Sequence, residues 1–89
     1  MNNKEMSKIL SGISFAILMA DRPSPEYIRE KIGCIHNPYI SFCQLDNENR
    51  RKVLRWGRIW GLDLQSFIDE LKEAWWSIPS SEFQERYCF

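Results

Sequence analysis

The sequence predicts an all-α fold, a compact single-domain bundle of four to six short helices with a C-terminal helical hairpin. Apolar side chains recur every three or four residues over most of the chain, which is the period of an α-helix. Residues that commonly begin and end helices flank several of these stretches. Of the 89 residues, 44% are hydrophobic and 13% aromatic, which is enough for one core and too little chain for two. We therefore treat residues 1–89 as a single helical domain.

The apolar period and the flanking signals together place six helices. The expected ranges are 4–20, 25–32, 38–44, 47–60, 64–78 and 81–87.

The first helix, residues 4–20, carries an apolar stripe with serines on the opposite side. The stripe contains Met6, Ile9, Ile13, Ile17 and Ala20. The serines are Ser7, Ser11 and Ser14. Because Phe15, Leu18 and Met19 lie outside the stripe, the last two turns are apolar nearly all round. Such a helix lies at the centre of a bundle or forms half of a homodimer interface.

The second and third helices share an opening signal of a capping residue followed by proline. Ser24 precedes Pro25, and Gly33 can adopt the left-handed conformation that ends the second helix. Asn37 precedes Pro38 in the same way and favours a short helix over 38–44. The aromatic and β-branched residues of this segment would also suit an extended strand.

Residues 47–78 have the clearest helix boundaries in the chain. Asp46 can cap the first helix of this pair, Gly61 can end it, and Asp63 can cap the second. The connection is so short that the two helices must form a hairpin.

The helix over 64–78 has a core-facing stripe, and a short helix follows it. The stripe contains Leu64, Phe67, Ile68, Leu71, Trp75 and Ile78. Pro79 ends the helix, and Ser80 is the expected cap of the final helix over 81–87.

The chain is neutral overall, but its charge is unevenly distributed. Residues 46–62 contain five cations against two carboxylates, and residues 63–89 contain six carboxylates against two cations. The chain therefore lacks the general positive field that draws proteins to DNA or to anionic membranes. The odd number of cysteines, three, argues against a disulfide framework and for a reducing compartment, so we expect a cytoplasmic protein. The apolar run near the N-terminus is too short to span a bilayer.

The helix over 47–60 separates its tryptophans from its arginines. One side of the helical wheel is apolar and contains Val53, Trp56, Gly57 and Trp60. The other side carries three arginines, Arg51, Arg55 and Arg58. We expect the tryptophans to join the core and Gly57 to permit close helix packing. The arginines suit bidentate pairing with carboxylate or phosphate, either in the acidic neighbouring helix or in a partner.

Trp76 points away from the apolar stripe of its helix. It is covered by C-terminal aromatics such as Phe83, Tyr87 or Phe89, with Lys72 stacked on its ring, or it anchors a partner protein. Together with the arginines, it makes the candidate partner-binding set: Arg51, Arg55, Arg58 and Trp76.

Two alternatives remain open. If residues 38–44 and 47–60 formed a helix-turn-helix, the second helix would read DNA with its N-terminal residues Asn47, Asn49, Arg50 and Arg51. A small zinc site is the other alternative, although the spacing is unusual; its ligands would be Cys34, His36, Cys43 and Cys88.

No catalytic constellation or cofactor motif is present in the sequence, so we expect no enzyme activity and no cofactor. The expected function is protein binding by a small adaptor, regulator or inhibitor that docks on a larger protein or protein–nucleic acid complex. No membrane contact is expected, and a homodimer through the first helix is a separate possibility.

Overall fold

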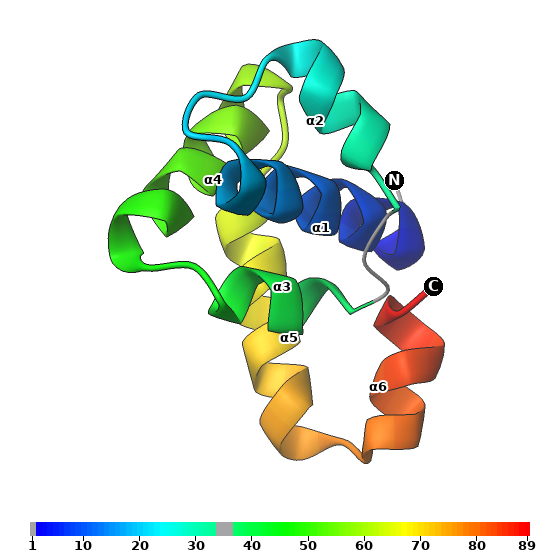
Figure 1. The fold of residues 1–89 in the computed structure, drawn as a ribbon. Helices are drawn as coiled ribbons and strands as arrows, with labels where there is room; N and C mark the ends of the chain where they lie inside the picture. Colours follow the sequence, from blue (N-terminus) through cyan, green and yellow to red (C-terminus); the bar gives the residue numbers. More distant parts are fainter. Residues whose placement is uncertain (1, 34–36) are drawn as a thin grey trace.

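Six helices make up the fold in the computed structural model, which describes residues 2–33 and 37–89 and contains no strand within them (Figure 1). The helices are α1 (Asn3–Met19), α2 (Pro25–Lys31), α3 (Pro38–Cys43), α4 (Asn47–Ile59), α5 (Leu64–Ser77) and α6 (Ser80–Tyr87). The predicted fold class is confirmed. Each helix begins and ends within one residue of its expected range, including the helix over the ambiguous segment that follows Asn37. The Cα radius of gyration, 12.1 Å, is that of a folded chain of this length.

α1 lies at the centre of the bundle and contacts α2, α3, α4 and α6 (Figure 1). Both of its sides are therefore buried, so the three serines opposite the apolar stripe are as inaccessible to solvent as Leu10 and Ile13. Of the two arrangements predicted for this helix, the central one is found.

Helix starts follow the local signals in four of the five predicted cases. The side chain of Asn37 accepts hydrogen bonds from the Tyr39 and Ile40 amides at 3.0 and 3.1 Å. The side chain of Ser24 accepts a hydrogen bond from the Tyr27 amide at 3.1 Å. Asp46 and Asp63 accept bonds from the amides three residues later, at 2.9 and 3.1 Å. The prediction that Ser80 caps the last helix is wrong. Pro79, already in an extended conformation, occupies the cap position, and α6 begins at Ser80 without a side-chain cap.

The turn between α4 and α5 is closed by backbone hydrogen bonds around Gly61. Gly61 has a φ of 73°, and its amide donates to the Arg58 carbonyl at 3.0 Å. The Leu62 amide donates to the Gly57 carbonyl at 2.7 Å, which completes a Schellman motif. A Cβ at Gly57 would lie 2.7 Å from Leu64 Cγ, so the predicted close packing of the two helices at this glycine is confirmed.

The core differs from the sequence expectation around its tryptophans. Trp75, expected on the buried stripe of α5, is 39% exposed, and the smaller Ala74 is buried instead. Trp56 and Trp60 are half-buried at the edge of the core, with ring centroids 5.8 Å apart. A domain this small encloses few bulky rings completely, so the broad side chains are left at the rim.

No helix within the described ranges combines the length and the apolar character needed to cross a bilayer.

Candidate functional site

Trp76 is the most exposed large apolar side chain of the described residues, with 79% of its surface accessible. The prediction that C-terminal aromatics cover it is wrong. Phe83 and Tyr87 point into the core, and the Phe89 ring lies 5.8 Å from Lys8 Nζ of α1. Within the described parts of the chain, no cation–π contact joins Lys72 to the Trp76 ring.

The neighbouring Trp75 fixes the end of α5 against two other helices. Its ring centroid lies 5.4 Å from that of Tyr39 in α3 and 5.1 Å from that of Phe83 in α6. The contact with Phe83 is edge-to-face, at an interplanar angle of 89°, a favourable geometry for aromatic pairs. Trp76 is therefore presented from a helix end that is held in place on two sides.

Three adjoining grooves follow α5 from its first turn to Trp76. The turn groove, about 400 Å³, is lined by Leu54, Arg58, Gly61, Leu62, Asp63, Leu64 and Gln65. The central groove, about 450 Å³, is lined by Tyr39, Phe42, Cys43, Asn47, Arg50, Arg51, Leu54, Gln65, Ile68, Asp69 and Lys72. The tryptophan groove, about 440 Å³, is lined by Asp69, Lys72, Glu73, Trp76 and Ser77. Adjacent grooves share lining residues, so the three form one continuous surface.

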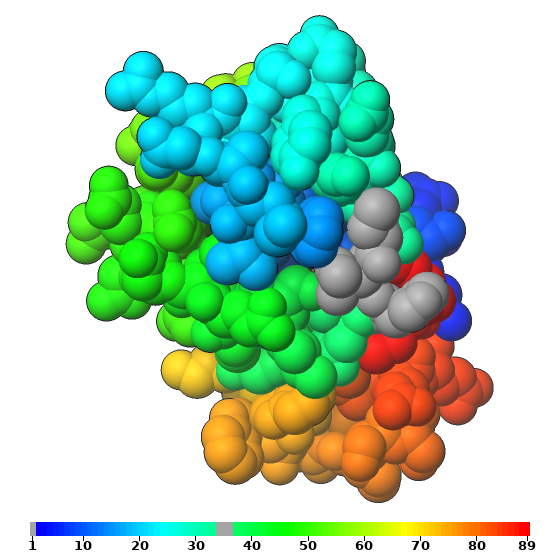
Figure 2. All heavy atoms as spheres, in the orientation of Figure 1, coloured from blue at the N-terminus to red at the C-terminus, as the bar shows by residue number. Residues whose placement is uncertain are grey.

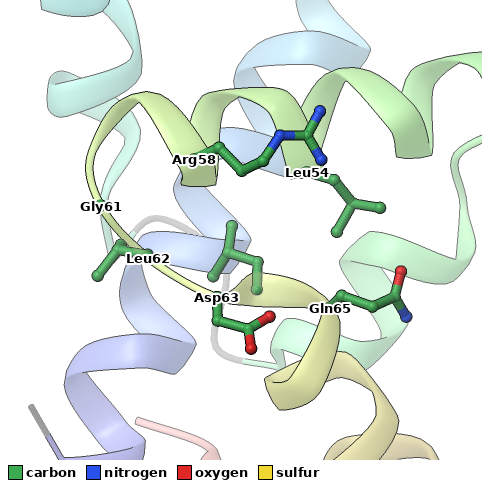
Figure 3. Close-up of a pocket in the computed structure, with 7 residues that line it drawn as sticks. Leu54, Arg58, Gly61, Leu62, Asp63 and Gln65 are labelled. Carbon is green, nitrogen blue, oxygen red and sulfur yellow. The ribbon is translucent and has the colours of Figure 1, made fainter.

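Figure 3 shows the turn groove between the end of α4 and the start of α5. Leu54 and Arg58 project from α4, while Gln65 lies across the groove on α5. The Asp63 carboxylate is turned toward its own helix, where the Ser66 hydroxyl donates to it at 2.6 Å. Hydrogen bonds from the Ser66 hydroxyl and amide lower the pKa of Asp63 below its ordinary value of 3.8.

The three candidate arginines do not share one surface. Arg58 lines the turn groove and Arg51 the central groove. Arg55 instead lies with Trp56 in a separate groove beside the loop that follows α1. Among residues 2–33 and 37–89, no carboxylate oxygen lies within 4 Å of these guanidinium groups, so the predicted pairing with the acidic helix does not form.

The central groove combines an apolar floor with a cationic rim. Phe42 and Ile68 form the buried part of the floor. The rim carries three cations, Arg50, Arg51 and Lys72, against the single carboxylate of Asp69. Sequence reasoning considered Lys72 only as a cover for Trp76, and it missed both the place of Lys72 on this groove and the contribution of α3. No local signal shows which helix faces α5.

Tyr39 also lines this groove and is neutral at physiological pH. Burial, followed by a hydrogen bond with Cys43, raises the pKa of its hydroxyl group above the ordinary value of 10.0. The tyrosine therefore adds a polar but uncharged group to the groove.

Of the four residues named for the DNA-reading alternative, Arg50 is engaged within the fold. Its Nη2 donates to the Cys43 carbonyl at 3.2 Å, and its guanidinium lies 5.2 Å from the centre of the Phe42 ring. Asn47 and Arg51 are exposed and Asn49 is half-buried. Duplex-DNA binding by α4 stays a prediction. An affinity for duplex DNA that falls steeply as the salt concentration rises would support it.

The zinc alternative depends partly on Cys34 and His36, which lie outside the described residues. Cys43 is an exposed free thiol in α3, and Cys88 is a half-buried free thiol after α6. In the described ranges, no cluster of three or more metal-binding side chains occurs. The alternative therefore stays a prediction, which metal analysis of protein purified without chelator can test.

The end of α1 retains a small apolar surface. Leu18 and Met19 are exposed, and Leu18 shares a hollow with Phe15 and Ile40 of α3. Figure 2 shows the end of α1, α3 and the last turns of α5 side by side on one face. The other exposed residues of α1 are polar or charged and lie in its first turns, at Asn3, Lys4, Glu5 and Lys8. An apolar homodimer contact through this helix would therefore be limited to its last turns.

Comparisons with protein-family models, with curated proteins and with solved structures find no match to this chain.

Proposed function

We propose that this protein is a non-enzymatic, cytoplasmic protein-binding module. It acts as an adaptor, regulator or inhibitor by docking on a larger protein or protein–nucleic acid complex and covering part of its surface. The observation that carries the proposal is the exposure of Trp76, because a tryptophan left in water gains most by burial in an interface.

The rigidity of the α5 end supports this role. Trp75 packs between Tyr39 and Phe83, so little backbone freedom remains to be lost when Trp76 binds. Pre-organised aromatic anchors of this kind contribute strongly to interface affinity.

The grooves beside Trp76 support a surface larger than one side chain. They connect Trp76 to Arg51 and Arg58, two exposed arginines without an internal partner among the described residues. Such arginines form bidentate hydrogen bonds with carboxylates and are enriched in protein interfaces. We therefore assign the docking surface to Arg51, Arg58 and Trp76, and leave Arg55 outside it.

Capture of a native partner by matched variants tests the proposal. The folded chain is immobilised in a lysate of its source organism, and bound proteins are quantified by mass spectrometry. We expect a partner that binds the wild-type chain and Ile59→Ala, whose lost side chain is also exposed (63%), but not Trp76→Ala. Arg51→Glu combined with Arg58→Glu should also release it, while Arg55→Glu should not. A partner that Trp76→Ala retains at full strength would refute the assignment.

A further inference from the structure

We propose that the central groove binds an acidic segment of the partner protein that inserts an apolar side chain. The proposal rests on the protein-binding function proposed above and specifies the chemistry that the partner presents.

The floor of the central groove is apolar and favours contact with an apolar side chain of the partner. Phe42 and Ile68 of the floor are buried in the fold, and Leu54 of α4 adds a half-buried side chain. The hollow of about 450 Å³ lies within the range of sites that enclose a small ligand, so it has room for a leucine, isoleucine or phenylalanine side chain. Insertion of such a side chain would release water from both apolar surfaces.

The rim of the groove is cationic and favours carboxylates of the partner on either side of the inserted apolar side chain. Arg51 projects from α4 and Lys72 from α5, so cations stand on both walls. Neither has a carboxylate within 4 Å among the described residues. The nearby Asp69 is already a hydrogen-bond acceptor, since Gln65 Nε2 donates to it at 3.0 Å. An acidic segment would supply the missing partners to both walls.

The neighbouring grooves favour a protein segment over a nucleic acid. Asp63 lies in the turn groove and Glu73 in the tryptophan groove, so carboxylates flank the cationic rim at both ends. A continuous phosphate backbone running along α5 would meet these charges, and the neutral chain offers no compensating field. A short acidic peptide confined to the central groove meets three cations and the single carboxylate of Asp69.

Selection from a library of short random peptides displayed on phage tests this chemistry. The probe is the library itself, selected on the folded 89-residue chain. We expect the enriched peptides to contain Asp or Glu on both sides of a large apolar residue. Backbone amide resonances of residues that line the central groove should shift when a synthetic enriched peptide is added.

Charge reversal shows whether binding uses the cationic rim. Arg51→Glu combined with Lys72→Glu leaves one cation against three carboxylates in the groove. It should lower the affinity for the acidic peptide at least about tenfold, as expected for loss of two charge pairs. A peptide in which Lys replaces each acidic residue should then bind the double variant better than the wild type. Arg55→Glu is the matched control and should change neither the affinity for the acidic peptide nor the affinity for the lysine peptide. Both arginines and Lys72 are exposed, and circular dichroism verifies that each variant is folded.

Three results would overturn the proposal. They are enrichment of peptides without acidic residues, an affinity that the double variant leaves unchanged, and displacement of the peptide from this groove by duplex DNA. None of them would remove a native partner that depends on Trp76, so failure of this inference is distinguishable from failure of the proposed function. Conversely, binding of an acidic peptide to the groove would support this inference even if no native partner were captured.

Discussion

Replacing Trp76 by alanine should change the stability of the fold very little, although tryptophan is the largest side chain. With 79% of its surface exposed, the residue buries about a fifth of roughly 250 Å², or on the order of 50 Å². At about 25 cal/mol per Å², this burial contributes about 1 kcal/mol. Alanine returns up to about 0.7 kcal/mol through its higher helix propensity. The free energy of unfolding should therefore fall by less than about 1 kcal/mol.

Two neighbouring aromatic residues provide a graded comparison for this prediction. Trp75, half as exposed and packed against two rings, buries on the order of 150 Å² and should cost about 3 kcal/mol when replaced by alanine, once the gain in helix propensity is subtracted. Phe83, which is 1% exposed, should cost about 3–5 kcal/mol because its removal leaves a cavity. Urea unfolding followed by far-ultraviolet circular dichroism measures all three variants without relying on tryptophan fluorescence.

The order of the three losses is the decisive result. If Trp76→Ala destabilised the chain as much as Phe83→Ala, the Trp76 ring would be covered in solution. The docking surface would then lose the residue on which it depends. A small stability loss together with loss of the captured partner would agree with an exposed anchor.

Other predictions concern the packing, capping and titration of the same fold. Gly12→Ala should lower the unfolding free energy by about 1–2 kcal/mol in urea titrations, because overpacking outweighs the gain in helix propensity. The added Cβ would lie 2.7 Å from Ile32 Cα, and an unchanged or raised stability would contradict this close packing. Asp46→Ala should cost about 1 kcal/mol in the same assay, and Asp46→Asn should retain most of the stability, since the side chain caps α4. Burial, and secondarily the charge of Glu70, raises the pKa of the Tyr87 hydroxyl above 10.0. The folded state thus holds this proton more tightly than the unfolded state, and the resulting stability is present below about pH 10 and lost as the pH rises further. In thermal melts recorded below and above about pH 10, the melting temperature of Tyr87→Phe should fall less steeply with rising pH than that of the wild type. An equal fall in the two proteins would contradict the burial of Tyr87.

The candidate site was only partly predictable from the chain. Trp76 could be singled out because its helical-wheel position departs from the apolar stripe of α5, a property of the helix alone. The sequence could not show that Arg55 lies on a different surface from Arg51 and Arg58, because the three share one stripe of α4. This difference depends on where the loop after α1 packs against that helix, which is a contact between distant parts of the chain.

The central groove lies furthest from what sequence patterns reveal. Its walls come from α3, α4 and α5, and its floor depends on how closely α3 approaches α5. Periodicity identifies which side of each helix is apolar, but it contains no information about which neighbour that side meets.

The sequence by itself determined the helices and most of their ends, because these depend on residues within one or two turns. Asp46 meets an amide three residues away, and Gly61 closes a turn whose bonds all lie within six residues. Only the tertiary structure decided which side chains are buried. It enclosed the serines of α1 and left Trp75 and Trp76 at the surface. Burial is the sum of contacts among helices far apart in the chain, and so small a domain cannot enclose every bulky side chain.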